Sequence, residues 1–136
     1  MKVFDLNDKE TEWRPKGKSK GTKVANRSKL HLHARKLLRE QYGSLVILEE
    51  VPFQAKGRKR LYFDFYIPVL KIAIEPCGEQ HYKFNRFFHS NNLAFYKQKR
   101  NDRWKAEWCE LNNILLIVLP FDEIELWPKL LQKEWK

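Results

Sequence analysis

The stretch "IEPCGEQHY", residues 74–82, gathers side chains that could do chemistry. Its polar members are Glu75, Cys77, Glu79, Gln80 and His81, all placed directly after an apolar run. Carboxylate, amide and imidazole groups in one short segment could bind a metal ion, orient a water molecule or transfer a proton. We therefore interpret this segment as one wall of a candidate active site, and the alternative is a turn that is merely polar.

A second carboxylate is predicted to face Glu75. The segments Leu61–Ile67 and Leu70–Glu75 both alternate between apolar and polar residues, as strands do. In the first, one face would carry Leu61, Phe63, Phe65 and Ile67, and the other Tyr62, Asp64 and Tyr66. A tight hairpin around residues 69–70 would pair Phe65 with Ile74 and so place Asp64 opposite Glu75.

Two opposed carboxylates are unfavourable without a compensating interaction. Directly opposite side chains have Cβ atoms about 5 Å apart, and like charges at that distance are destabilising. A divalent cation that bridges the pair would offset this cost, since hard cations prefer carboxylate oxygens. The alternative is a pair of carboxylates on a wet sheet face with a slipped register. A one-residue slip would bury a charge, which disfavours that alternative.

A helix is predicted upstream of these strands. Ser28 is a suitable N-cap for a helix that runs to about Gln41, and Gly43 follows its end. The expected inner stripe is Leu30, Ala34, Leu37 and Gln41, flanked by Leu38 on one side and by His33 and Glu40 on the other. Glu40 could supply a third carboxylate at the sheet edge, although a surface position in the last turn explains it equally well.

The remaining pattern predicts a mixed sheet of about four strands with helices on its faces, an α/β fold. A strand is expected over Leu45–Val51, a helix over about Asn92–Leu111, and a short C-terminal helix over about Ile124–Trp135. The fully apolar run "ILLIVL", Ile114–Leu119, predicts a central strand. The long helix would bury a stripe of Leu93, Tyr96, Trp104, Trp108 and Leu111, with Asp102 roughly opposite, toward solvent or DNA.

The charge of the chain is strongly basic and unevenly distributed. Formal net charge is +10, and residues 14–29 include seven basic residues and no acidic one. Two further clusters are "KGRKR" (56–60) and "KQKRNDRWK" (97–105). Three such clusters favour a phosphate backbone as partner over a merely solvated surface. No basic stretch has a matching apolar face, which argues against an anionic membrane.

The composition indicates the number of domains and the class of protein. The 136 residues, 43% of them hydrophobic, fit one domain with a real core. We expect a basic, flexible arm over residues 1–27 and a single domain over 28–136. No apolar run approaches the roughly 20 residues of a membrane span, and the N-terminal residues do not resemble a signal peptide. Two cysteines form no disulfide framework, so a cytoplasmic protein with reduced thiols is expected.

These motifs together resemble a known nuclease family. Asp64, ten intervening residues, Glu75 and a short polar turn, preceded by a helix with Glu40, resemble the PD-(D/E)XK core. The segment "FDFYIPVLKIAIEPCGEQHY" is most similar to the branch of very-short-patch repair endonucleases and phage-encoded endonucleases. The likeness extends from about Ser28 to Phe121.

The resemblance implies a restriction-endonuclease-like core and hydrolysis of DNA phosphodiester bonds with Mg²⁺ or Mn²⁺. It makes Asp64 and Glu75 the metal ligands and implies a host-cytoplasmic enzyme of phage or mobile-element origin. Nicking, structure-specific cleavage and a role in recombination or repair all remain open. Because the chain has no separate recognition domain, a homodimer, a partner protein or DNA shape would supply specificity.

One position departs from the family pattern. The lysine usual two residues after the glutamate is replaced by Cys77, which cannot supply a positive charge. Gln80 or His81 is left to orient the water or protonate the leaving oxygen. His81 is the preferred acid/base, because the very-short-patch repair branch places a functional histidine six residues after the glutamate.

The basic clusters supply the expected DNA contacts, and Asp102 is a second-tier site candidate. The predicted phosphate-binding residues are Lys16, Lys18, Lys20, Lys56, Arg58, Lys59, Arg60, Lys97, Lys99, Arg100, Arg103 and Lys105. A zinc site of Cys77, His81, His89 and Cys109 is a weaker alternative, because its spacing matches no common closed motif. The rival class is a nucleic-acid-binding protein with a degenerate nuclease site.

Overall fold

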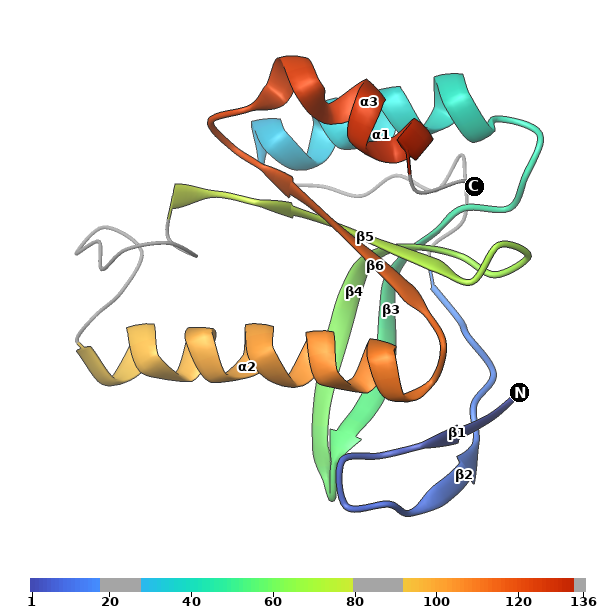
Figure 1. The fold of residues 1–136 in the computed structure, drawn as a ribbon, viewed down its shortest axis with the longest axis vertical. Coiled ribbons are helices and arrows are strands. Elements are labelled where there is room, and N and C mark those ends of the chain that lie inside the picture. Colours follow the sequence, from blue (N-terminus) through green and yellow to red (C-terminus); the bar gives the residue numbers. More distant parts are fainter. Residues whose placement is uncertain (18–27, 80–91, 134–136) are drawn as a thin grey trace.

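The computed structural model describes residues 1–17, 28–79 and 92–133 of the chain. Its elements are β1 (Lys2–Phe4), β2 (Glu10–Glu12), α1 (Lys29–Tyr42), β3 (Leu48–Lys56), β4 (Lys59–Ile67), β5 (Ile72–Cys77), α2 (Asn92–Leu111), β6 (Leu115–Pro120), a 3-10 turn (Ile124–Leu126) and α3 (Trp127–Lys133). The layers are α1 with α3, the main sheet, and α2, as Figure 1 shows. The predicted mixed α/β architecture is confirmed.

The main sheet has the order β3-β4-β5-β6. β3, β4 and β5 are antiparallel neighbours, whereas β5 and β6 run parallel because α2 connects them. The prediction that the apolar run of β6 forms a central strand is wrong: β6 lies at an edge of the described sheet. It is nevertheless apolar because Ile117 and Leu119 pack under α1 and α3 while Leu116 packs on the α2 side.

The predicted register between β4 and β5 is confirmed. Phe65 pairs with Ile74 and Ile67 with Ile72, around a four-residue turn over residues 68–71. β5 starts two residues later than expected and continues through Pro76 to Cys77, so the proline does not end the strand. The next pair along this register is Asp64 and Glu75.

The predicted faces of β4 are only partly right, because the β3–β4 hairpin bends at its middle. Glu50 adopts a left-handed φ of 55°, opposite Asp64, and the ladder skips this pair. As a result Phe65 packs under α1, whereas Phe63 packs on the α2 side. Tyr66, expected beside Asp64 on the polar face, is fully buried.

Helix α1 begins as expected at the N-cap Ser28, whose Oγ accepts a hydrogen bond of 3.1 Å from the His31 backbone N–H. Its buried stripe is rotated from the predicted one: the buried residues are His31, Ala34, Leu38 and Tyr42. Leu30 and Leu37 are only partly buried at its margin. The rotation follows from Tyr42, which fills the core and donates to the Leu131 carbonyl of α3 at 3.1 Å.

Helix α2 has the predicted bounds but not the predicted orientation. Trp108 and Cys109 are its buried residues, whereas Leu93, Tyr96 and Leu111 are exposed. Trp108 packs against Trp13, with ring centroids 5.1 Å apart, and against Phe53 at 4.5 Å. These contacts turn the Asp102 side of the helix toward the sheet rather than toward solvent.

The N-terminal residues do not form the predicted arm over residues 1–17. β1 and β2 form a two-stranded sheet, and Val3 and Trp13 are buried in the core on the α2 side. Asn112 pins β1 to the end of α2: its Oδ1 accepts from the Phe4 N–H at 2.7 Å and its Nδ2 donates to the Phe4 carbonyl at 2.9 Å. Residues 18–27 of the predicted arm lie outside the described residues.

Candidate active site

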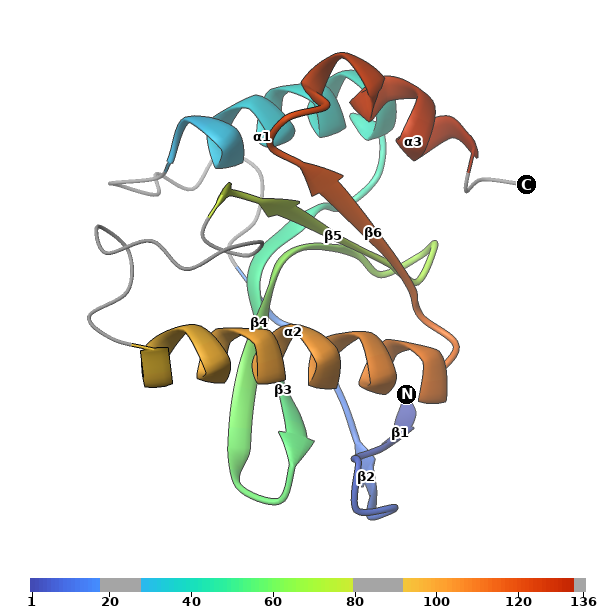
Figure 2. The ribbon, with the colours of Figure 1, turned by 60° about the vertical axis from the view of Figure 1, so that its left-hand side comes forward.

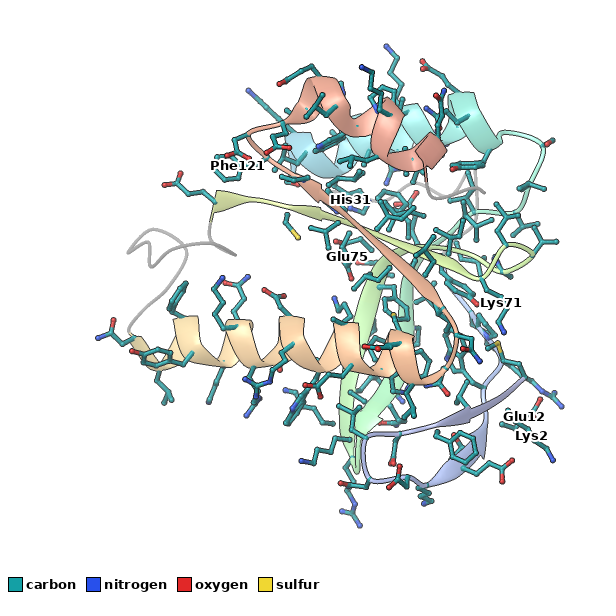
Figure 3. All side chains as sticks on the ribbon, viewed as in Figure 1. Lys2, Glu12, His31, Lys71, Glu75 and Phe121 are labelled. Carbon is teal, nitrogen blue, oxygen red and sulfur yellow. The ribbon has the colours of Figure 1, made fainter. Side chains whose placement is uncertain are left out.

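The candidate site lies between β5, β6 and α2 (Figure 2), and Glu75 points from the sheet toward the helix (Figure 3). It is a pocket of about 180 Å³ lined by Glu75, Cys77, Lys99, Asp102, Lys105, Leu116 and Val118. One wall is apolar and comes from β6. The others bring carboxylates and lysines together from elements that lie far apart in sequence.

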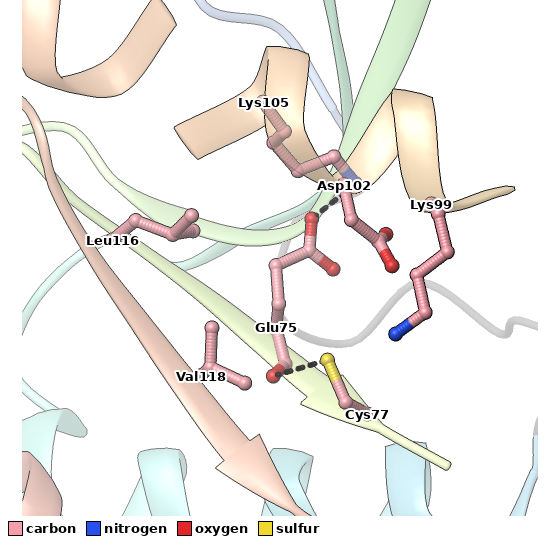
Figure 4. Close-up of a pocket in the computed structure, with 7 residues that line it drawn as sticks. All are labelled: Glu75, Cys77, Lys99, Asp102, Lys105, Leu116 and Val118. Atoms are coloured by element: carbon pink, nitrogen blue, oxygen red, sulfur yellow. Dashed lines mark hydrogen bonds and ion pairs between the residues drawn. The ribbon is translucent and has the colours of Figure 1, made fainter. Parts of the chain in front are cut away.

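Glu75 and Lys105 form the central contact of the pocket. The Nζ of Lys105 donates to Oε1 of Glu75 at 2.5 Å, and both side chains are mostly buried (Figure 4). The contact joins β5 to α2 across 30 residues of sequence. A positive charge therefore stands beside Glu75 although Cys77 occupies the position where the nuclease family usually has its lysine.

Asp64 is the second carboxylate of the site, as the register predicts. Burial raises the pKa of Glu75 well above its ordinary value; Lys105 opposes this shift, and the adjacent Asp64 adds to it through a direct side-chain interaction. Glu75 thus lies between a carboxylate and an ammonium group. Two carboxylates this close favour a shared proton or a bound cation between them.

Lys105 keeps its positive charge in this environment. Burial acts to lower the pKa of its ammonium group, but Glu75, Asp64 and Asp102 together raise it above the ordinary value. Asp102, a second-tier site candidate that the helix pattern placed toward solvent or DNA, lines the pocket with Lys99 on the same helix. Sequence spacing already held a signal for this arrangement, since residues 99, 102 and 105 recur every three positions on one side of α2.

The two thiols are buried groups of low reactivity. Burial raises the pKa of Cys77 and of Cys109 to about 12, and the nearby Glu75 carboxylate adds to both shifts. A zinc site would require the opposite, a lowered thiol pKa. Cys77 lies at the end of β5 and Cys109 on the buried side of α2, while His81 and His89 lie outside the described residues.

Several predicted site residues do not join this pocket. Glu40 is exposed on α1, and α1 covers the sheet face opposite α2, so the prediction that it reaches the site is wrong. Its helix turns Ala34 and Leu38 to the sheet instead. Gln80 and His81, the predicted substitutes for the lysine, lie outside the described residues, as do Lys18 and Lys20.

The basic clusters meet at one aromatic side chain. Lys56, at the end of β3, lies 5.5 Å from the ring of Trp104 on α2, and Arg100 lies 4.6 Å from the same ring. Sequence clusters 56–60 and 97–105 are therefore continuous in space. The other predicted phosphate-binding residues of these clusters are Arg58, Lys59, Arg60, Lys97 and Arg103, all exposed, and the partly buried Lys99. Lys105, also predicted to bind phosphate, instead pairs with Glu75 inside the pocket.

A buried polar cluster on the other face of the sheet escaped prediction. Glu49 accepts hydrogen bonds of 2.8 Å from the Nε and Nη2 of Arg35, and its Oε1 lies 2.8 Å from His31 Nε2. His31 also stacks on Phe65 with a centroid distance of 4.5 Å. The cluster fixes α1 on β3 and lies behind the strand that carries Asp64.

Comparisons with known proteins give viral relatives. A 65-residue stretch, 48% of this chain, is 43% identical to Uncharacterized protein 307L of Invertebrate iridescent virus 6. A 61-residue stretch, 45% of this chain, is 38% identical to Uncharacterized protein 033L of Invertebrate iridescent virus 3. The matches span about a third of these relatives, 33% and 31% of their lengths. No protein-family model and no solved structure matches the chain.

No helix in the described part of the chain combines the length and apolar character needed to cross a membrane. The long helix α2 illustrates the reason. It carries basic residues along most of its length, and its partly buried side lines a polar pocket.

Proposed function

We propose that the chain is a divalent-metal-dependent endonuclease that hydrolyses DNA phosphodiester bonds at the Glu75 pocket. The observation that carries the proposal is the opposed pair Asp64–Glu75 with Lys105 bonded to Glu75. Two adjacent carboxylates, one of them buried, destabilise the fold unless a proton, a cation or a cationic side chain offsets their repulsion. Glu75 and Lys105 line the pocket and Asp64 neighbours Glu75, so together they supply the two acids and the lysine of the nuclease resemblance.

The two carboxylates Asp64 and Glu75 are of the ligand type that Mg²⁺ prefers, and two is the smallest number that the proposal needs. Within the described residues, no three His, Cys, Asp or Glu side chains are arranged to hold a metal ion. Mg²⁺ commonly keeps several waters and is held by one or two carboxylates together with substrate phosphates. Asp64 and Glu75 would be those two carboxylates. When bound, the ion would lower the pKa of a water molecule and neutralise charge on the phosphoryl oxygens.

The protein's own side chains would prepare the site for this reaction. Lys105 holds Oε1 of Glu75 in place and supplies positive charge where negative charge develops as water adds to phosphorus and the P–O bond breaks. Asp102, on the same pocket wall, helps to keep Lys105 protonated. Gln80 and His81 remain the predicted groups for orienting the water and protonating the leaving oxygen.

The continuous basic surface around Trp104 would position the DNA. Phosphate contacts fix orientation without reading sequence, so specificity would come from DNA shape, a partner protein or a homodimer. Nicking, double-strand cleavage and action on branched recombination or repair intermediates are all compatible with one such site. The expected source is a phage or a mobile element, and the matched relatives, from invertebrate iridescent viruses, support a viral context only.

The second candidate is a nucleic-acid-binding protein that has lost catalysis. Cys77 in the lysine position favours it. In that case the ion pair of Glu75 and Lys105 would be a structural link between β5 and α2. Only the metal-dependent chemistry separates the two functions, because both predict DNA binding.

The test compares wild type with Glu75→Gln on supercoiled, linear and branched DNA, in Mg²⁺, in Mn²⁺ and in EDTA. We expect metal-dependent cleavage that Glu75→Gln reduces about 100-fold or more, because the substitution removes a ligand but keeps the shape. Glu40→Gln is the matched control, since it removes an exposed carboxylate from the opposite face, and it should cleave like wild type. Tight binding without cleavage of any substrate would refute the nuclease proposal and favour the non-catalytic nucleic-acid-binding protein.

A further inference from the structure

We propose that a groove between residues 12–16 and β3 is a second binding site, for the phosphodiester backbone of a nucleic acid. The groove has a volume of about 340 Å³ and shares no lining residue with the Glu75 pocket. In Figures 1 and 2 the chain that leaves β2 runs beside β3, whereas the Glu75 pocket is lined by residues of α2, β5 and β6. The site is therefore separate from the proposed catalytic centre.

Three cations line this groove, and the nearest acid is Glu12, which interacts with Arg14 without forming an ion pair. The three cations are Arg14, Lys16 and Arg60, all exposed. Within residues 1–17, 28–79 and 92–133, none of the three forms an ion pair with a carboxylate. Like charges gathered in a concave surface repel one another, and a bound polyanion removes that repulsion.

Glu12, the acidic residue that lines the groove, already has a cationic partner. Oε1 of Glu12 accepts from the N-terminal ammonium group of Met1 at 3.0 Å, and this hydrogen bond lowers the pKa of Glu12. Its charge is thus offset by a partner outside the groove lining. The field inside the groove remains positive.

The walls are held rigidly enough to present these cations. Trp13 Nε1 donates to the Pro52 carbonyl at 3.0 Å, and the Trp13 ring packs on Tyr66 and Trp108. Arg60 lies on β4 directly opposite Gln54 in the hairpin ladder. A wall built on strands and a buried tryptophan needs little ordering when the ligand binds.

The arrangement of charge around the groove favours a nucleic acid over a single anion. Arg58 and Lys59 continue the positive surface at the hairpin tip. A uniform polyanion such as a phosphate backbone can engage cations along this whole length, and its binding would release counterions.

The test measures binding in EDTA by fluorescence anisotropy, with Glu75→Gln as the parent protein. The groove variant is Arg14→Gln/Arg60→Gln. The matched control is Lys36→Gln/Lys129→Gln, which removes two exposed charges from α1 and α3. Duplex DNA, single-stranded DNA and RNA of equal length are the probes, and circular dichroism confirms that each variant is folded.

We expect the groove variant to bind about tenfold more weakly and the slope of log K against log salt to become shallower by 1 to 2, about 0.9 for each phosphate that the variant no longer neutralises. The control should bind like its parent. Arg14→Lys/Arg60→Lys keeps the charges and should retain most of the affinity. The probe whose affinity falls the most identifies the form of nucleic acid that the groove holds.

Equal weakening in the groove variant and the control would show that only total charge matters, and would overturn the proposal. Unchanged affinity in the groove variant would overturn it as well. The result is independent of catalysis, because the parent lacks Glu75 and no metal is present. A wild-type protein that never cleaves DNA would refute the proposed nuclease and leave the groove site intact.

Discussion

At the scale of single residues, the most consequential side chain is Lys105. It reaches Glu75 from α2, whereas the nuclease pattern places its lysine on the same strand as the glutamate, where this chain has Cys77. If a positive charge at this point is what the reaction needs, its origin in the chain should matter less than its position.

The first prediction concerns moving the lysine from position 105 to position 77. Lys105→Met should reduce cleavage about 100-fold, because it removes the charge but keeps an unbranched side chain. Adding Cys77→Lys to that variant should restore part of the activity. Lys36→Met, which removes an exposed lysine of α1, is the control and should cleave like wild type. Full activity in Lys105→Met, measured by single-turnover cleavage, would exclude the proposed role.

A second residue-scale prediction concerns stability and pH. Burial acts to raise the pKa of Glu49, but hydrogen bonds from His31 and Arg35 outweigh it and lower the pKa to about 2. A lowered folded-state pKa contributes stability above the ordinary value of 4.5, and this contribution is lost as pH falls toward 2. It amounts to about 3 kcal/mol at neutral pH.

Urea unfolding of wild type and Glu49→Gln checks this contribution. The difference in free energy of unfolding should be about 3 kcal/mol at pH 7 and should shrink steadily between pH 4.5 and pH 2. Glu40→Gln is again a suitable control, because an exposed substitution should change stability by less than about 0.5 kcal/mol. A difference that does not depend on pH would show that Glu49 acts through packing alone.

At the scale of elements, the β4–β5 hairpin was the most predictable part of the fold. Strict alternation and one short turn leave a single register that pairs apolar residues, so Asp64 opposite Glu75 follows from sequence. The helix faces were less predictable. A small rotation of α2 about its axis would bury a different face that is equally mixed in polar and apolar residues. The contact of Trp108 with Trp13, 95 residues away, determines which face packs on the sheet.

Long-range contacts also explain the other differences. Residues 1–17 are rich in charge, which is typical of an arm, yet Val3 and Trp13 are buried and Met1 and Leu6 pack against the same core. Gly17 completes the attachment: a Cβ there would lie 2.4 Å from the Glu49 carbonyl oxygen, so only glycine permits this approach to β3. The residues around Gly17 in the sequence do not predict that β3 will lie beside it.

The N-terminal attachment gives an element-scale prediction. Trp13→Ala should lower the free energy of unfolding by about 3–5 kcal/mol, because the side chain is 8% exposed and packs between Phe63, Tyr66 and Trp108. Phe4→Ala, at a ring that is 42% exposed on the neighbouring strand, is the control and should cost about 1 kcal/mol or less. Chemical denaturation measures both, and similar small decreases would indicate a loosely held arm.

At the scale of the whole molecule, charge is the dominant property. The net charge is +10, and the clusters that sequence shows as separate come together along the β3–β4 hairpin and α2. Such a surface should bind nucleic acid mainly through the release of counterions from phosphates.

The corresponding prediction is a steep salt dependence. If four or more phosphates are contacted, the slope of log K against log salt for duplex DNA should be about −3.6 or steeper. Titrations between low and physiological salt provide the measurement, with poly-glutamate as a competitor to compare polyanions. A slope near zero would mean that the basic surface does not carry the binding.

The ion pair between Glu75 and Lys105 also has a consequence for the order of synthesis. Both carboxylates have left the ribosome's catalytic centre once residue 75 is added, but the lysine follows 30 residues later and Trp108, which seats its helix, later still. A nascent chain that ends before residue 105 therefore contains the whole acidic hairpin without its counter-charge. The proposed chemistry would therefore become available only after α2 has been synthesised and has packed on the sheet.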